Sequence, residues 1–492
     1  MFEGLAAGLD MVADWQYEYS TEFVLRDTVM NYAPCRAYGK FYQPTLSPSY
    51  WDPQIFGWHP TVKDKDGKPQ KIRMCQSADE VAIKAWMVLS AVPVHSLALY
   101  ETDMWEWGLK GAATNGREHT YAEPDVVERY GRMWKERIAP VADLFRDMPN
   151  ARAPLAIVIL NECQYSIGNG YCNYHYPNQL ALALAPYGLP YDFVCGHELE
   201  TAGLAGYRYA LLPMAQAIYE EHVKDLEAAA AKGVTIVTDK YAAKTFANGV
   251  HLDKLDHPWT PREFPRLHKT LQDWYGPLVP ELRRAAVAWS DCDGTNGFTF
   301  VKQMDGVRYV SVVNDRRSDD PGYLGQFVTN AWYRPMGAPQ RITTHIKVPK
   351  GGQVYEFNGK EGFKVSGFQG FRVHGAQECS VACDYAPAEG RVFCIYPKAL
   401  KKLSVSRAGD ALEVTLVDVD GKPAPGRQVV EVEVRDPSGA LHDETGRYVM
   451  EKGHLVVPLR FADDDPPRGL FSAWTASVRE LTTGFTDDCK IR

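Results

Sequence analysis

The sequence lacks the features that place a chain across a membrane, around zinc or within a disulfide framework. Its ten cysteines contain no CxxC pair, so we expect mostly buried thiols, although a pair such as Cys379 and Cys383 could bridge in an oxidising compartment. It has no run of about 18 apolar residues, and residues 1–30 show neither the basic nor the apolar region of a signal peptide. We expect no membrane span. The location stays open between cytoplasm, periplasm and exterior, because it depends on the true N-terminus.

Basic residues are too few to indicate a nucleic-acid partner. The formal net charge is −8 at pH 7, whereas binding to a phosphate backbone calls for a basic patch. The spacings typical of nucleotide loops, HExxH metal sites and EF-hands are also missing. We therefore expect no nucleic acid, no cofactor and no metal.

Aromatic residues, in contrast, are abundant, at 12% of the chain. An apolar run that starts at Leu97 ends in carboxylates and indole rings, namely Glu101, Asp103, Trp105, Glu106 and Trp107. In a (β/α) barrel the catalytic groups follow the carboxyl ends of the strands, and flat rings stack on sugar faces. The segment therefore predicts a carbohydrate site, with a tryptophan-rich core as the alternative interpretation.

Residues 1–148 alternate between strand and helix in the manner of a (β/α) barrel. The apolar periodicity predicts strands over 9–15, 40–46 and 95–100, and helices over 21–32, 78–89 and 125–148. Three such units cannot close a barrel, which needs eight, and their open parallel edge calls for a cover. We interpret this part as the C-terminal part of a barrel plus a linker helix, with the other barrel half supplied from elsewhere.

The rest of the chain predicts three further domains, so the fold class is multidomain α/β plus all-β. Residues 149–290 alternate βα again, with strands over 155–160, 191–195, 209–213 and 234–239, which is typical of a flavodoxin-like doubly wound domain. From residue 297 the apolar period changes to two. We expect a β-sandwich over 291–398 and an immunoglobulin-like β-sandwich over 399–492.

Hydrolysis of a glycosidic bond needs one protonated and one ionised carboxyl group about 5 to 10 Å apart. Glu18 is the candidate acid/base, because Tyr17 and Tyr19 would desolvate it and raise its pKa, and Glu101 is the candidate second carboxylate. The candidate substrate-binding residues are Asp14, Trp15, Gln43, Trp51, Trp58, Asp103, Trp105, Glu106 and Trp107. The alternative is that the carboxylates only bind sugar hydroxyls or pair with nearby arginines, and that the tryptophans anchor a long loop.

The stretch from YDFVCGHE to KGVTIVTD, residues 191–239, resembles the trimerisation domain of glycoside hydrolase family 42 β-galactosidases. In that domain a strand beginning Tyr-Asp is followed by a Tyr-containing strand ending in Leu-Pro, then a helix and a Gly-Val-Thr strand. The resemblance implies a glutamine-amidotransferase-like fold, usually without catalysis, that follows a glycosidase barrel. It also implies the order of parts over residues 80–400, which is barrel end, this domain and then β-sandwich.

Two groups of residues limit what the resemblance implies. The family's nucleophile follows the seventh barrel strand, but the strand in that place here offers Gln43 and Thr45 and no carboxylate. Amidotransferase relatives use a Cys-His-Glu triad, and Cys195, His197 and Glu198 invite that interpretation. Their spacing argues against it, since such a nucleophile needs a strained elbow between small residues and a distant histidine.

The sequence thus predicts a glycoside hydrolase, or its C-terminal half, that acts on an oligo- or polysaccharide through a carboxylate pair. One alternative is a non-catalytic carbohydrate-binding or scaffolding subunit with a degraded barrel, and another is amidase chemistry in the doubly wound domain. We expect a homo-oligomer or a partner that supplies the missing barrel half.

Overall fold

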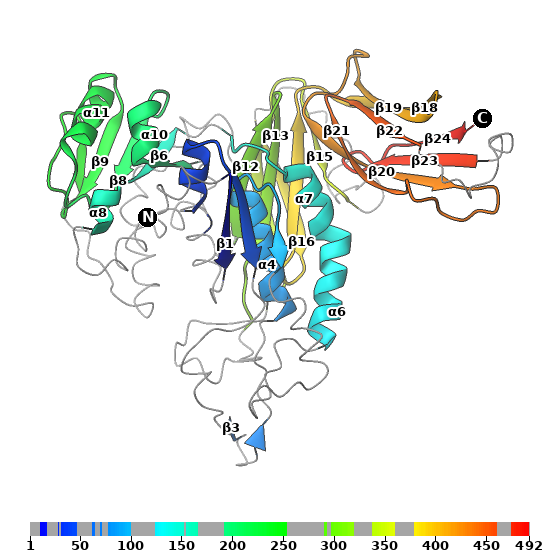
Figure 1. The fold of residues 1–492 in the computed structure, drawn as a ribbon, viewed down its shortest axis with the longest axis horizontal. Coiled ribbons are helices and arrows are strands. Elements are labelled where there is room, and N and C mark those ends of the chain that lie inside the picture. Colours follow the sequence, from blue (N-terminus) through cyan, green and yellow to red (C-terminus); the bar gives the residue numbers. More distant parts are fainter. Residues whose placement is uncertain are drawn as a thin grey trace.

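A computed structural model describes the chain over residues 10–16, 28, 31–46, 62–63, 69–70, 77–99, 124–151, 154–165, 191–252, 290–292, 297–318, 337–359, 378–459 and 474–491. Figure 1 shows a doubly wound unit at one end and an antiparallel sheet at the other, with a short parallel sheet, helices and a β-sandwich between them. In the described part, no helix has the length and apolar character needed to cross a membrane.

Three parallel strands form the N-terminal sheet, in the order β1-β2-β5. They are β1 (Met11–Gln16), β2 (Phe41–Leu46) and β5 (Ala98–Leu99). All three were expected, but β5 is shorter than predicted. The His95 N–H still donates to Tyr42 O of β2, whereas Val94, just before it, forms a bridge with Arg146. A separate two-stranded ribbon pairs β3 (Val62–Lys63) with β4 (Pro69–Gln70).

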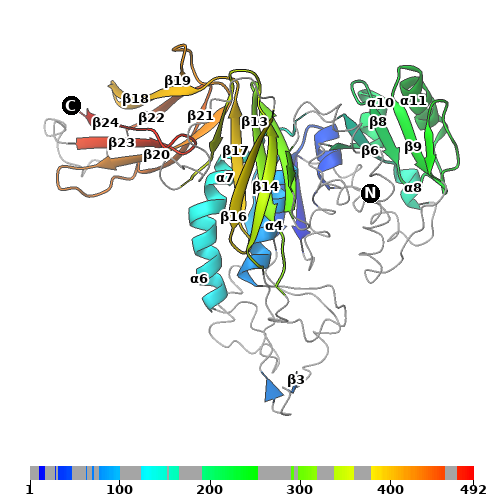
Figure 2. The same cartoon turned by 180° about the vertical axis from the view of Figure 1, so that it is seen from behind.

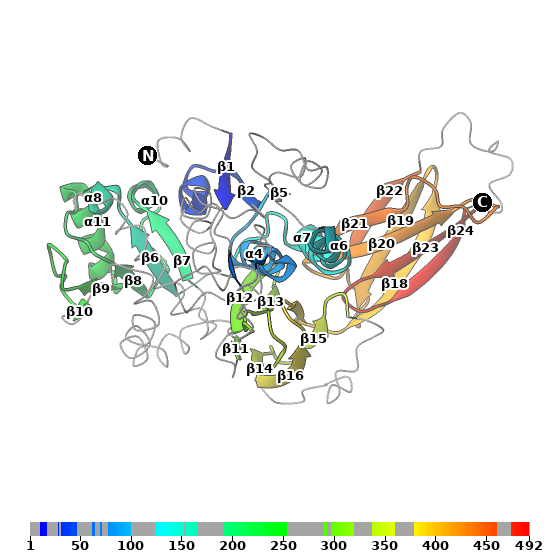
Figure 3. The same ribbon diagram turned by 90° about the horizontal axis from the view of Figure 1, so that it is seen from below.

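Helix α4 (Ala78–Ala91) lies in the middle of the molecule (Figure 3). It begins at Ser77, whose hydroxyl accepts the Glu80 N–H at 3.1 Å, and it ends just before Pro93. The sequence predicts one apolar face, yet every residue of the helix is buried. The physical reason is that β2 packs on one side while β12 (Gly297–Met304), β13 (Val307–Asn314) and the next helix cover the others.

The predicted single helix over 125–148 is continuous but changes its winding. It consists of α6 (Pro124–Met133), the π-helical turn η1 (Trp134–Ile138) and α7 (Ala139–Phe145). The Ala139 N–H bonds Trp134 O five residues back, and Pro140 has no N–H to continue the α pattern. Past its end, Arg427 donates from the C-terminal sheet to the carbonyls of Leu144 and Arg146, which caps the helix.

Five parallel strands build the doubly wound unit, and the four expected from the sequence are confirmed. They are β6 (Leu155–Ile159), β7 (Tyr191–Cys195), β8 (Tyr209–Leu212), β9 (Thr235–Asp239) and β10 (Val250–Leu252). Their order β7-β6-β8-β9-β10 is the 2-1-3-4-5 order of flavodoxin-like sheets. The described helices are α8 (Asn161–Tyr165), α10 (Gly196–Thr201) and α11 (Glu220–Ala231). Gly233, with φ +97°, follows α11 as its sequence predicts.

Two antiparallel sheets follow and pack face to face over an apolar core (Figure 2). One contains β12, β13, β17 (Gly390–Tyr396) and β15 (Gln353–Glu356), and the other contains β11 (Ser290–Cys292), β14 (Gln340–Lys347) and β16 (Glu378–Tyr385). The suggested bridge between Cys379 and Cys383 is wrong. Both lie on β16 four residues apart, which puts their Cα atoms about 13 Å from each other, too far for a disulfide.

The C-terminal part is one seven-stranded antiparallel sheet, where two separate sheets were expected. Its order is β18-β19-β22-β21-β20-β23-β24. The strands are β18 (Leu400–Ala408), β19 (Ala411–Asp418), β20 (Arg427–Arg435), β21 (Gly446–Glu451), β22 (His454–Pro458), β23 (Trp474–Glu480) and β24 (Thr486–Ile491). The two edge strands approach each other, since Val405 N donates to Asp487 Oδ2 at 2.8 Å. The sheet therefore curls around its buried Trp474 and nearly closes.

Buried polar groups connect these parts. Tyr309 donates its hydroxyl to Arg427 O at 2.9 Å and accepts the Arg427 N–H at 2.8 Å, which joins the sandwich to the C-terminal sheet. Lys302 is fully buried and donates to Met148 O and Asn150 Oδ1, both at 3.2 Å. Burial lowers the pKa of Lys302 to about 7.

Replacing Gly390 by alanine tests how closely α4 packs on β17. A Cβ at this position would lie 2.2 Å from a ring carbon of Trp86, so we expect a loss of about 1 to 3 kcal/mol in the free energy of unfolding. Gly131→Ala is the matched control, because a Cβ there meets nothing within 4 Å and alanine favours the helix by about 1 kcal/mol. Calorimetry should show a lower melting temperature for G390A only. Equal melting temperatures for G390A and the unchanged chain would contradict this packing.

Candidate functional site

Most of the residues predicted for the site lie outside the described part of the chain. These are Glu18, Glu101, Trp51, Trp58, Asp103, Trp105, Glu106 and Trp107. Asp14 and Trp15 lie on β1, and Gln43 lies half-buried on β2. The structure therefore brings three of the predicted positions onto two neighbouring strands, and the geometry of those strands defines the candidate site.

The three strands of the N-terminal sheet end at the same edge. Their register aligns Gln16 with Leu46, and Leu46 with Leu99, so the carboxyl ends lie side by side. Neighbouring strands are about 4.8 Å apart, which puts the ends of β1 and β5 about 10 Å from each other across β2. In sequence, Glu18 follows the end of β1 by two residues, and Glu101 follows the end of β5 by two.

The two faces of this sheet differ in burial. Tyr42 and Leu46 point to the side that packs with α4 and are almost fully buried. On the other face, Met11 and Phe41 lie opposite each other in the register and are 43% and 53% exposed. A parallel sheet in a closed barrel is buried on both faces. The face that would line a barrel interior is thus open at these two residues.

A second polar cluster lies at the carboxyl end of the doubly wound sheet. Glu162 follows β6, and its Oε1 lies 2.6 Å from His222 Nδ1 and accepts the Tyr219 N–H at 3.1 Å. His222 Nε2 lies 3.2 Å from Glu200 Oε1. The cluster sits beside the boundary of β6 and β8, where the strand order reverses and where sheets of this kind bind ligands. The sequence analysis did not predict this cluster. The polar residues Asn161 and Glu162, directly after the apolar run LAIVIL, could have indicated it.

The electrostatics of this cluster favour a charged pair. Hydrogen bonding to Glu162 raises the pKa of His222 above its ordinary value. Burial alone would raise the pKa of Glu162, but the hydrogen bonds from His222 and Tyr219 bring it below its ordinary value. The neighbouring Cys163 is buried, and that burial raises the pKa of its thiol to about 12, which disfavours the thiolate that a nucleophile needs.

The structure gives His197 and Glu198 contacts with the N-terminal part. The ring of His197 stacks on Tyr38, with centroids 4.1 Å apart and planes 2° from parallel. Glu198 Oε2 accepts a hydrogen bond from Arg36 Nη2 at 2.8 Å. Cys195 is buried at the end of β7. These contacts favour the interpretation of VCGHE as an interface and not as a triad.

Within the residues that the structure describes, no group of histidine, cysteine, aspartate and glutamate side chains could hold a metal ion. No protein-family model matches the chain, and a search of curated proteins finds no match.

The chain is similar to several solved glycoside hydrolases. Over 80% of its length it aligns with a β-galactosidase from Bacillus circulans sp. alkalophilus at 11% identity and a TM-score of 0.49, and it covers 61% of that enzyme. A GH42 exo-carrageenase from Bacteroides ovatus aligns over 80% of the chain at 11% identity and a TM-score of 0.45, with 49% of that enzyme covered. An α-L-fucosidase from Paenibacillus thiaminolyticus aligns over 73% at 9% identity and a TM-score of 0.43, with 60% covered.

The chain therefore spans about 60% of the length of the β-galactosidases with which it aligns.

The pair of His222 and Glu162 makes stability depend on pH. Its contribution is lost as pH rises through the raised pKa of His222, and lost as pH falls through the lowered pKa of Glu162. We expect His222→Gln to reduce the free energy of unfolding by about 1.5 to 3 kcal/mol at about pH 6, and by less at about pH 9. Thermal melts across this range measure the difference.

The control is His454→Gln. His454 also lies 3.0 Å from a glutamate, Glu413, but the two side chains are 52% and 41% exposed. An exposed pair contributes about 1 kcal/mol or less, so this variant should follow the unchanged chain at every pH. Equal losses for H222Q at both ends of the range would contradict a charged pair.

Proposed function

We propose that this chain is the C-terminal part of a glycoside hydrolase, with Glu18 and Glu101 as its carboxylate pair. The observation that carries the proposal is the alignment of the carboxyl ends of β1, β2 and β5 at one edge. Both glutamates follow strand ends that lie about 10 Å apart, within the range over which a pair of glycosidase carboxylates works. Carboxylates at the carboxyl edge of parallel strands are the usual layout of a barrel active site.

The substrate in this proposal is an oligo- or polysaccharide. Asp14, Trp15 and Gln43 belong to the strands of the same edge. The segments that follow these strands in sequence add six further candidates, four tryptophans and two carboxylates, namely Trp51, Trp58, Trp105, Trp107, Asp103 and Glu106. Indole rings stack on the apolar faces of sugars, and carboxylates accept their hydroxyl hydrogens.

The proposal includes a partner that completes the barrel. Three parallel strands with an open face at Met11 and Phe41 bury less apolar area than a closed barrel does. The remaining strands would come from another part of the same protein, from a second polypeptide or from a second copy. The doubly wound unit would then serve assembly, since its His197 and Glu198 already contact Tyr38 and Arg36 of the N-terminal part.

A second candidate is a non-catalytic carbohydrate-binding or scaffolding subunit. The observation that favours it is β2, which would be the seventh strand of the barrel and carries Gln43 and Thr45 in place of a carboxylate. Such a subunit would bind sugars at the same edge without hydrolysing them. Activity of the assembled complex distinguishes the two candidates.

The test compares the chain alone with its assembled complex. We expect the 492-residue chain alone to release no nitrophenol from a panel of p-nitrophenyl glycosides that begins with the β-galactoside. The complex with the polypeptide that supplies the other strands should release it. Within that complex, Glu18→Gln or Glu101→Gln should lower kcat about a hundred- to ten-thousand-fold, because each removes a group that transfers a proton or attacks the sugar.

Glu413→Gln is the control in that assay, because Glu413 is an exposed carboxylate on the C-terminal sheet and lies far along the chain from the edge. It should leave kcat unchanged. Wild-type turnover by E18Q and E101Q in an active complex would refute the assignment of the pair. Full turnover by the monomeric chain would refute the need for a partner.

A further inference from the structure

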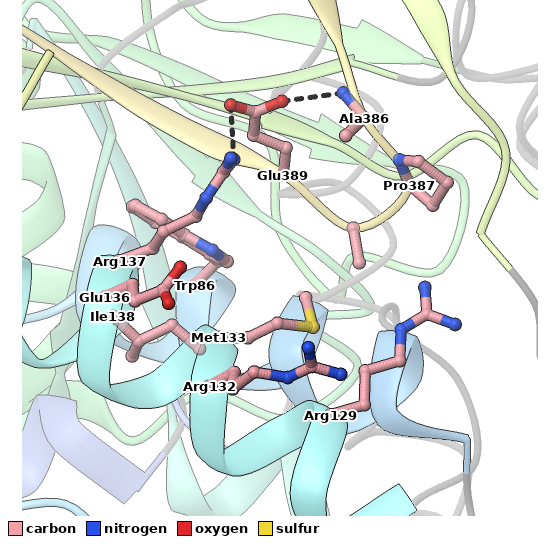
Figure 4. A pocket seen from close by; sticks show the side chains of 11 residues that line it. Trp86, Arg129, Arg132, Met133, Glu136, Arg137, Ile138, Ala386, Pro387 and Glu389 are labelled. Carbon is pink, nitrogen blue, oxygen red and sulfur yellow. Dashed lines mark hydrogen bonds and ion pairs between the residues drawn. The ribbon is translucent and has the colours of Figure 1, made fainter. Parts of the chain in front are cut away.

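A groove runs between the helix α6–η1–α7 and the first β-sandwich, away from the carboxyl edge of β1, β2 and β5. It consists of two adjoining pockets of about 310 and 560 Å³ that share Trp86, Glu136, Arg137 and Glu389. Figure 4 shows the smaller pocket, where Arg137 reaches from the helix to Glu389 on the sandwich. Volumes of about 300 to 1,000 Å³ are typical of small-molecule sites.

A chain of ion pairs with buried carboxylates crosses the groove. Arg137 Nη1 lies 2.5 Å from Glu389 Oε1, which Arg391 Nε approaches to 3.4 Å. Arg391 Nη1 in turn donates to Glu356 Oε1 at 3.1 Å. The carboxylates of Glu356 and Glu389 are 9% and 10% exposed, whereas the Arg137 side chain is 43% exposed. Donors and acceptors therefore alternate from the helix to the sandwich.

Further arginines of the groove are paired as well, so the wall has little net charge. Arg479 lies 3.6 Å from Glu431, Arg447 lies 2.8 Å from Asp143, and Arg129 lies 2.5 Å from Asp79. An anionic ligand would have to compete with these carboxylates for the guanidinium groups. A neutral molecule with many hydroxyls can instead donate to the carboxylates and accept from the guanidinium groups without breaking a pair.

One buried acceptor beside the groove has no hydrogen-bond partner among the described residues. Glu356 lines the larger pocket, and its Oε2 is buried and accepts no hydrogen bond from them. A buried carboxylate oxygen without a donor is costly, so this side chain would gain by turning the oxygen toward a ligand hydroxyl. Trp86, Val141 and Val392 lie beneath the groove and are almost fully buried, so contacts with a ligand fall to the polar side chains above them.

We propose that this groove is a second saccharide site that binds a short neutral oligosaccharide between η1 and the sandwich. The π-helical turn contributes Lys135, Glu136 and Arg137 to it, and π-helical turns are frequent at functional sites. The choice of a saccharide rests on the proposed function. The site itself needs no hydrolysis, and none of the described strand-end residues Gln16, Leu46 and Leu99 lines it.

The test measures binding to the 492-residue chain by isothermal titration calorimetry. The probes are galactotetraose, cellotetraose, xylotetraose and maltotetraose, with tetragalacturonate as an acidic comparison. We expect at least one neutral probe to bind and tetragalacturonate to bind at least tenfold more weakly. Glu356→Gln and Arg137→Gln should each weaken the neutral probe at least tenfold, because each removes one member of the polar chain.

Asp384→Asn and Arg341→Gln are the matched controls, since Arg341 and Asp384 form an exposed ion pair on the same sandwich outside the groove. They should bind like the unchanged chain. Melting temperatures within about 3 °C of the unchanged chain show that the variants remain folded. If E356Q melts more than about 3 °C below the unchanged chain, Asn358→Ala is used in its place. Asn358 lines the groove, and its side chain donates an exposed hydrogen bond to Glu136 O.

Three results would overturn the proposal: no binding of any neutral probe, equal binding by the groove variants and the controls, or preference for tetragalacturonate. If no neutral probe binds and E356Q and R137Q also melt at lower temperatures than the unchanged chain, the ion pairs only fasten the helix to the sandwich. Binding is measured without turnover, so its outcome is separate from the hydrolysis assay. The groove variants could abolish binding of a neutral probe while the complex hydrolyses no glycoside. That combination would support this site and refute the catalytic proposal.

Discussion

Burial of α4 on every side is the constraint on which the rest of the structure depends. β2 covers one side of the helix, α6 to α7 cover another, and β12 and β13 close the third. Asp79, although charged, is 1% exposed and is held by Arg129 and by the Gly337 N–H. A buried charge persists only when paired, so the helix brings its partners into place with it.

The same helix separates the two places where this chain is proposed to bind sugars. One side supports β2, whose end belongs to the candidate catalytic edge, and the other side presents Trp86 to the groove. Close packing at Gly390 leaves this indole no space to move, since even one added carbon would overlap it. The candidate edge and the groove thus share this helix as a rigid support.

The doubly wound unit uses its polar residues to hold structure together. Arg36, which precedes β2 in the chain, donates to Glu198, while His222 and Glu162 fasten α11 to the end of β6. Sheets with this strand order commonly bind ligands at the place where that second pair lies. Here the buried thiol of Cys163, with its raised pKa, is unsuited to nucleophilic chemistry.

The sequence by itself determined the elements whose signals are local. Apolar periodicity placed β2, β7, β8 and β9 within about one residue of their observed bounds. The strand-end carboxylates Glu18 and Glu101 stay a prediction from the sequence. Tertiary structure alone decided the burial of α4, the curled seven-stranded sheet and the groove. Arg137, Glu356 and Glu389 come from segments far apart in the chain, and no periodic pattern records which distant side chains meet. Their ion pairs arise only when the helix packs on the sandwich, because pairing depends on distance in space.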